Sequence, residues 1–236
     1  MTRFIYSASG VAVAGRFRRP LATDLDAIAA CVLPSFGGRV ASRAGAFHLA
    51  DPASGELMLA FESAQTSIEA GESAPGVFTT VLRTLVCGLN VGNVLKAEEA
   101  VAALSLHYDS RNRRVSIDTA GSGFKGLVLS SQAFALTLDH QLGREAADYA
   151  QFRKNHPELP ESHGATRYSL ARHPALKFDS HEHAYLDWPG CGRIYFCEWS
   201  AAPYTQSLTM LRLRLGSPQE GEVEIGRGGA DGHDYP

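Results

Sequence analysis

A five-residue segment, DSHEH, holds the side chains best suited to chemistry in this chain. If the segment is extended, Asp179, His181 and His183 point to one side of it, because side chains alternate along a strand. Two histidines and a carboxylate at this spacing suit zinc or iron, with open positions for water. His173 or His163 could add a further ligand. The alternative is an exposed loop with a chance cluster, and we favour it because the chain has nine histidines.

Four aromatic residues in the last quarter of the chain are candidates for a binding surface: Trp188, Tyr195, Trp199 and Tyr204. Aromatic side chains at a surface suit a carbohydrate or a protein partner. Packing in the core is the competing interpretation, and we favour it for these four residues.

Strict alternation places Glu198 on the same face as Ile194 and puts Cys197, as a small core residue, on the opposite face. A carboxylate on an interior face needs a partner. We therefore expect a buried ion pair between Glu198 and either Arg212 or Arg214.

The sequence GSGFKG at residues 121–126 has the glycine spacing of a phosphate-binding loop. Such a loop needs a following helix, whereas Leu127-Val-Leu129 favours a strand. We expect a turn here. Ser122 has neither the sequence context of a nucleophile elbow nor an evident base. No catalytic residue is predicted.

Strand-like segments are spread along the chain and are separated by glycine. In Leu208–Leu215 the leucines at 211, 213 and 215 alternate with Met210, Arg212 and Arg214, as in a strand with one buried face. Other such segments are 3–9, 11–17, 55–69, 77–89 and 96–106, the last followed by a turn and a hairpin strand at 115–118. Residues 24–33 fit either a short helix or a strand.

A helical pattern interrupts the strands. Leu142, Ala146, Tyr149 and Phe152 recur at helical spacing until Pro157. We expect an all-β or mainly β protein, an antiparallel sandwich or irregular barrel, with one inserted helix near 142–155. Residues 1–226 would form one domain with a helical and polar insertion at 139–187, and residues 227–236 a flexible tail.

Several segments together resemble the choice-of-anchor P family of bacterial surface proteins. They are Val91–Leu106, Gly121–Leu129, Leu186–Glu198 and Leu208–Gly226, with the glycine-flanked strands, the GSGFKGLVL strand and the PGCGRIYF turn and strand. The resemblance covers about half of the chain. It implies a β-rich, extracellular, non-enzymatic domain and carries over no catalytic residue.

Composition limits the classes of function. The chain of 236 residues has 22 basic and 25 acidic residues without a basic stripe, which argues against nucleic-acid binding. No run of 18 apolar residues predicts a membrane-spanning helix. Four cysteines without a CxxC pair favour free thiols in a reducing compartment, and a disulfide would require export.

These observations favour a non-enzymatic structural or interaction protein that acts through its β surface, with a protein partner or a second copy of itself. Exposed strand edges favour a homo-oligomer. The alternatives are a metal-dependent enzyme centred on Asp179, His181 and His183, and a glycan-binding module. The amino terminus lacks the apolar segment of a signal peptide, so we expect a cytoplasmic protein unless export follows an unconventional route.

Overall fold

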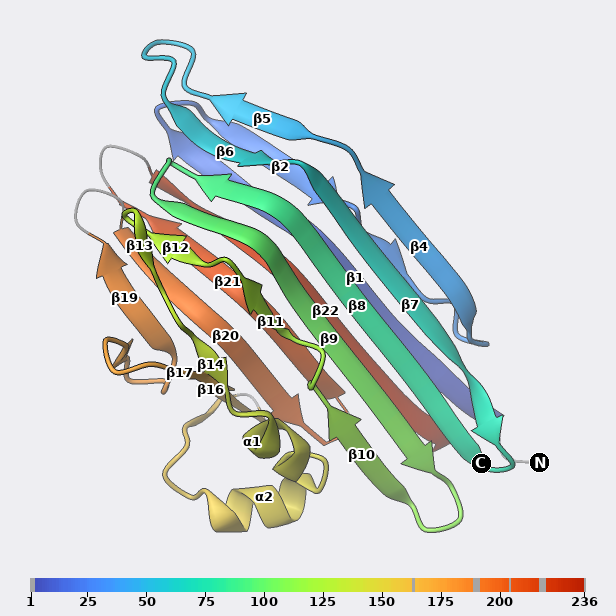
Figure 1. Ribbon diagram of the computed structural model, residues 1–236. Coiled ribbons are helices and arrows are strands. Elements are labelled where there is room, and N and C mark those ends of the chain that lie inside the picture. The colour runs from blue at the N-terminus through green and yellow to red at the C-terminus, as the bar shows by residue number, and fades with distance from the viewer. Residues whose placement is uncertain (1–2, 163, 189–191, 204, 217–219, 236) are drawn as a thin grey trace.

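The chain folds into two stacked antiparallel β-sheets with two short helices at one end (Figure 1). The computed structural model describes residues 3–162, 164–188, 192–203, 205–216 and 220–235. The prediction of an all-β sandwich is confirmed. Both sheets are open, with strand orders that run from one edge strand to another.

Sheet A combines the amino-terminal strands with those of the last third of the chain. Its strands are β1 (Arg3–Arg19), β2 (Thr23–Ile28), β3 (Cys31–Val32), β15 (Glu161–Ser162), β16 (Ala165–Ser169), β18 (Lys177–Phe178), β19 (Ala184–Trp188), β20 (Gly192–Ala202), β21 (Thr205–Leu215) and β22 (Glu220–Tyr235). The strand order is β15-β16-β20-β21-β22-β1-β2, with β3 paired to β1 and β18–β19 joined to β20.

Sheet B is built from the middle of the chain. Its strands are β4 (Gly38–Ala44), β5 (Phe47–Ala50), β6 (Leu57–Phe61), β7 (Ser63–Ala74), β8 (Val77–Val91), β9 (Leu95–Asp109), β10 (Arg114–Asp118), β11 (Gly123–Lys125), β12 (Val128–Leu129) and β13 (Gln132–Ala133). β9 and β10 form the predicted hairpin. A separate pair consists of β14 (Thr137–Leu138) and β17 (Ala171–Arg172).

The core lies between the facing sides of the two sheets. Phe17 of β1, Leu82 of β8 and Ile225 of β22 are among its fully buried residues. Each such side chain stabilises the fold by about 1.5–3 kcal/mol relative to exposure. A side chain at Gly228 would meet Leu82, so glycine allows the sheets to approach closely at this point.

Two helices replace the single predicted one. They are α1 (His140–Glu145) and α2 (Tyr149–Asn155). The side chain of Asp148 accepts a hydrogen bond from the backbone of Gln151 and so begins a second helix within the helical pattern. The segment expected as a helical and polar insertion, 139–187, also contributes strands to sheet A, because β16 and β19 pair with β20.

The predicted tail at residues 227–236 is wrong as far as Tyr235. These residues continue β22, which pairs with β1 from Arg3↔Tyr235 to Gly10↔Gly228. The glycines that suggested flexibility lie in a paired strand. The inner face of this strand packs on sheet B. Residues 3–17, expected as two strands, form one strand, and residues 24–33 form β2 and β3 rather than a helix.

The alternation of buried and exposed residues reverses phase at one row that crosses sheet A. The row comprises Ala12, Gly226, Met210 and Cys197, and the residues on either side of it pair in unbroken register. Cys197 and Gly226 have φ values of 50° and 64°. Sheet B has a similar row at Gly88, where φ is also 64°. At each row two consecutive residues face the same side, so the side chains that follow lie on the opposite face from the one that strict alternation predicts.

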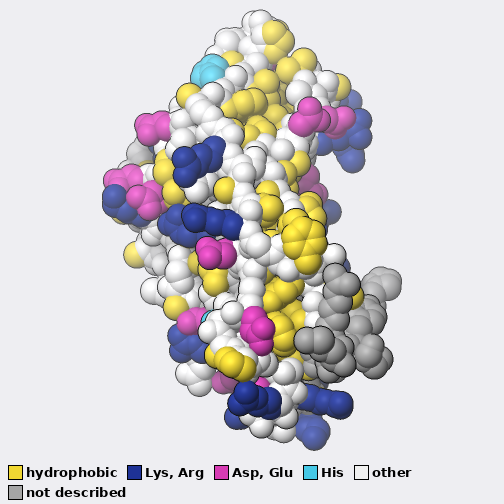
Figure 2. All heavy atoms as spheres, turned by 90° about the vertical axis from the view of Figure 1, so that its right-hand side faces the viewer, with side chains coloured by type: hydrophobic (Ala, Val, Ile, Leu, Met, Phe, Trp, Pro, Cys, Tyr) yellow, Lys and Arg dark blue, Asp and Glu magenta, His cyan; other side chains and the backbone are white. Residues whose placement is uncertain are grey.

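The edge of the sandwich beside β4 exposes apolar side chains. From this side, hydrophobic side chains form a band down the molecule with charged side chains on both flanks (Figure 2). Val32 and Phe36 lie where the chain passes from sheet A to sheet B, and they are 73% and 75% exposed. The outward side chains of the edge strands themselves are charged: Asp24 and Asp26 on β2, Arg39 and Arg43 on β4.

Candidate functional site

The predicted ion pair of Glu198 is formed with Arg212. Arg212 donates from Nε and Nη2 to the two carboxylate oxygens of Glu198, at 2.7 and 2.5 Å. The side chains are 16% and 13% exposed. Burial opposes the charge of Arg212, but hydrogen bonding and attraction to Glu198 outweigh it and raise the pKa of Arg212.

This pair lies on the outer face of sheet A, which corrects the expected direction of Glu198. Cys197 occupies the row of phase reversal, so Glu198 and Ile194 lie on opposite faces. Cys197 itself is buried in the core, as expected, and its burial raises the pKa of its thiol. The carboxylate therefore meets Arg212 across a strand pair rather than inside the hydrophobic core.

The turn between β18 and β19 places His183 over Glu198. His183 Nδ1 lies 3.3 Å from Glu198 Oε1 and 3.6 Å from Asp179 Oδ2. Asp179 holds the turn by accepting hydrogen bonds from the backbone N–H groups of His181 and His183, at 2.8 and 3.0 Å. Glu182 turns the chain with a φ of 56°.

Asp179, His183, Glu198 and Arg212 thus form a continuous polar chain on the sheet. Burial lowers the pKa of His183, and the neighbouring carboxylates of Glu198 and Asp179 offset this only in part. Burial would raise the pKa of Asp179, but the backbone hydrogen bonds from His183 and His181 outweigh it and lower that pKa. At neutral pH the imidazole is therefore uncharged and can donate one hydrogen bond to a carboxylate.

The predicted metal ligands are only partly brought together. His181 is exposed, and its ring lies 6.1 Å from that of His183. His173 Nδ1 accepts a hydrogen bond from the backbone of Ala175, away from this turn, and His163 lies outside the described residues. Within the described ranges, no group of three or more His, Cys, Asp and Glu residues could hold a metal ion.

The predicted aromatic surface does not form as a unit. Trp199 is 1% exposed and belongs to the core between the sheets, because it follows the phase reversal. Tyr195 is also buried, but on the outer face, where the guanidinium of Arg212 lies 4.0 Å from its ring centre. Trp188 is half-buried against the core, and Tyr204 lies outside the described residues.

A row of charged side chains crosses sheet A next to Tyr195. Its members are register neighbours on successive strands: Asp187, Arg193, Arg214, Glu222, Arg16 and Asp24. Arg193 pairs with Asp187 at 3.1 Å and Arg16 with Asp24 at 3.0 Å. Such exposed pairs contribute little to stability, but they leave these charges partnered within the sheet.

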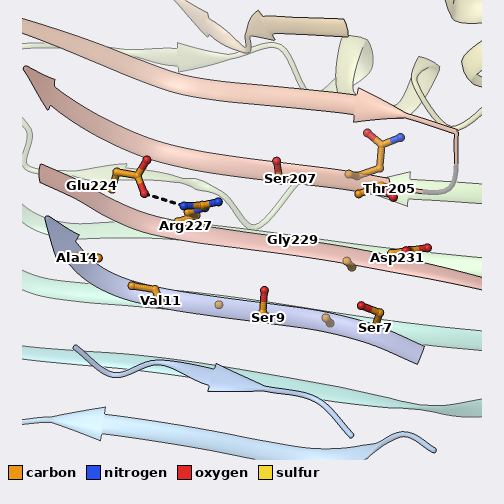
Figure 3. Close-up of a pocket in the computed structure, with 14 residues that line it drawn as sticks. Ser7, Ser9, Val11, Ala14, Thr205, Ser207, Glu224, Arg227, Gly229 and Asp231 are labelled. Carbon is orange, nitrogen blue, oxygen red and sulfur yellow. Dashed lines mark hydrogen bonds and ion pairs between the residues drawn. The ribbon is translucent and has the colours of Figure 1, made fainter. Parts of the chain in front are cut away.

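The same outer face is hollowed beyond the phase reversal. A trough of about 430 Å³ lies over β1, β22 and β21. Its floor carries small side chains, including Ser9, Ser207 and Gly229 on three adjacent strands (Figure 3). Arg227 and Glu224, 3.1 Å apart, form an ion pair at one end. Ser7, Ser9 and Thr205 are exposed, so this part of the sheet is open to solvent.

Comparison with known proteins gives a family without a described activity. Residues 4–185 match the family named Domain of unknown function (DUF8256). The chain belongs to the DUF8256 family. Neither the curated proteins nor the solved structures contain a significant match.

The DUF8256 match ends inside β19 and so includes Asp179 and His183 but not Glu198 or Arg212. The polar chain therefore joins a turn inside the matched region to two strands beyond it. Among the described residues of this DUF8256 protein, no helix has the length and apolar content needed to cross a membrane.

Sequence reasoning missed the trough because four of its fourteen lining residues, Arg227, Gly229, Ala230 and Asp231, come from the expected tail. The signal was present: Val223 and Ile225 alternate with Glu222 and Glu224 just before it, as in a strand. Gly226 hides the continuation, because the buried positions then shift to Gly228 and Ala230.

Proposed function

We propose that this DUF8256 protein is a non-enzymatic interaction protein, that its working surface is the outer face of sheet A, and that its partner is a second copy of the chain. The observation that carries the proposal is the trough over β1, β22 and β21. Its small side chains let another flat surface approach the backbone closely, whereas long side chains would hold such a surface away.

Charge on this face supports contact with a partner. Glu198, Arg193 and Arg16 each have an oppositely charged neighbour within the sheet. Covering a charge that is already paired costs less than covering an isolated one. These three charges can therefore be buried without becoming uncompensated.

The edges of the sheets are less suited to contact with a second copy of the chain than this face is. β13 and β15 have two residues each, and β2 and β4 carry exposed Asp26 and Arg43. Short or charged edge strands oppose pairing with another chain. We therefore assign self-association to the face rather than to the edges, which differs from the expectation drawn from the sequence.

Other readings have weaker support. Glu198, the carboxylate nearest His183, is bound to Arg212, which leaves little for a metal-dependent reaction. Trp199 lies in the core and cannot offer its ring to a glycan. The resemblance to the choice-of-anchor P family agrees with a role by contact and remains a prediction.

Light scattering on a dilution series tests the proposal. We expect the mass of the wild-type protein to rise with concentration, and Ser9→Arg or Ser207→Arg to shift the midpoint to higher concentration by about tenfold or more, because a long charged side chain fills the trough. Ser67→Arg, on the outer face of β7 in sheet B, is the matched control and should behave as wild type. A wild-type protein that stays monomeric at all concentrations would overturn the proposal.

A further inference from the structure

A cleft larger than the trough lies where the β9–β10 hairpin faces the two helices. It has a volume of about 960 Å³ and is lined by residues 112–116 of the hairpin and by residues 144–145, 147–152 and 155 of the helical segment. Pro203, after β20, also lines it. This size falls in the range of about 300–1,000 Å³ typical of small-molecule sites.

The walls of this cleft are partly apolar and are held in place. Val115 and Tyr149 are half-buried and pack against the core, whereas Phe152 is 1% exposed and supports the wall from behind. Tyr149 contributes its ring, while its hydroxyl is hydrogen-bonded to Thr166 Oγ1 at 3.1 Å. An apolar wall and a few fixed polar groups are the usual composition of a ligand site.

The carboxylates that line the cleft are engaged within the protein. Asp109 accepts a hydrogen bond from Asn112 Nδ2 at 2.7 Å, and this bond lowers the pKa of Asp109. Glu145 lies 2.8 Å from His156 Nε2. Asp148 accepts the backbone N–H of Gln151 at the start of α2. These groups have structural partners and are poorly placed to receive a ligand.

The arginines at the hairpin turn, unlike these carboxylates, have no charged partner among the described residues. Arg113 and Arg114 line the cleft and are exposed, and neither forms an ion pair with any other residue of the described ranges. Arg144, on the facing helix, lines the same cleft and pairs with Asp118 at 3.3 Å. Guanidinium groups bind carboxylate, sulfonate and phosphate oxygens through two parallel hydrogen bonds.

We propose that this cleft binds a small amphipathic organic anion, with its acidic head at Arg113 and Arg114 and its apolar body against Tyr149 and Val115. The inference is independent of the self-association proposed above, because it uses a different surface. The acidic head explains why two unpaired arginines stand at the rim. The apolar body matches the wall behind them.

Fluorescence titration with anilinonaphthalene sulfonate, an anion with an aromatic body, tests the proposal. We expect saturable binding to the wild-type chain and binding about tenfold or more weaker in Arg113→Glu/Arg114→Glu, because each charge-assisted contact is lost. Ala150→Trp, an exposed position that lines the cleft, should also weaken binding by occupying the space. Arg39→Glu/Arg43→Glu on β4 is the matched charge control and should bind as wild type.

Competition defines the ligand class. Octanoate should displace the probe, whereas inorganic phosphate at the same concentration should not, since it lacks an apolar body. The neutral N-phenylnaphthylamine should bind more weakly than the sulfonate. The proposal is overturned if the wild type shows no saturable binding, if the cleft variants bind the sulfonate as tightly as wild type, or if phosphate or the neutral probe matches the anions.

A further variant separates binding from folding. Arg113 has a φ of 50°, a conformation that favours glycine. Arg113→Gly should therefore keep or raise the unfolding temperature while it weakens sulfonate binding. Unchanged sulfonate binding in this variant would contradict a role for the Arg113 side chain.

Discussion

His183 is a buried imidazole between two carboxylates, and its burial couples protonation to folding. Burial lowers the pKa of His183 below its ordinary value of 6.5. As pH falls through the ordinary value of 6.5 towards the lower pKa of the folded protein, the unfolded chain takes up the proton before the folded protein does. The contribution of His183 to stability is therefore complete well above pH 6.5 and is lost as pH falls towards the folded pKa. We expect the free energy of unfolding, measured by urea denaturation, to decrease over this interval.

His183→Gln should flatten this pH dependence, because the group that titrates is gone. His48→Gln, an exposed histidine on β5, serves as the control and should keep the wild-type slope. A His183→Gln protein with the wild-type slope would show that burial of this imidazole does not couple to stability.

At the scale of elements, the phase reversal across sheet A depends on Gly226. Its φ of 64° favours glycine, and a side chain there would lie 3.2 Å from Met210 Cγ and 3.3 Å from Thr84 Oγ1. We expect Gly226→Ala to lower the free energy of unfolding by about 1–2 kcal/mol, from backbone strain and crowding. Urea denaturation measures this change.

Gly71 on β7 is the matched control. Its φ is not in the left-handed region, and a side chain there would meet nothing within 4 Å. Gly71→Ala should leave stability unchanged or raise it by about 0.4–1 kcal/mol, because alanine restricts the unfolded chain. Equal losses in the two variants would argue against a special role for the row that contains Gly226.

At the scale of the whole molecule, β22 connects the two ends of the chain in one sheet. It lies between β21 and β1 and pairs with both as far as Asp231, and residues 232–235 pair with β1. Deleting residues 228–236 removes these ladder pairs and exposes two strands. With a net contribution of about 1 kcal/mol per hydrogen bond, the loss is on the order of 5–10 kcal/mol, comparable to the total stability of a domain.

We therefore expect the shortened chain to lose cooperative thermal unfolding, as followed by circular dichroism. Deleting only residues 235–236 removes the single pair with Arg3 and should leave the transition intact. A cooperative transition in the longer deletion would show that residues 228–236 behave as the tail expected from the sequence.

The sequence by itself determined the local features of this protein. Alternation in Leu208–Leu215 indicates β21, and the polar turn after Leu106 indicates the β9–β10 hairpin, because both signals lie within a few neighbouring residues. The ion pair of Glu198 followed from a general requirement, since a carboxylate that leaves water needs a cation. Arg212 was one of the two partners expected.

Only the tertiary structure decided which face each side chain occupies and which distant segments meet. Phe196 and Cys197 are consecutive and both face the core, which places Glu198 outward and Trp199 inward. Strict alternation does not predict this change of face. The trough and the pairing of β22 need contact between residues at the two ends of the chain. Such pairing depends on how strands far apart in sequence are stacked, whereas hydrophobic periodicity reports only the environment of each strand.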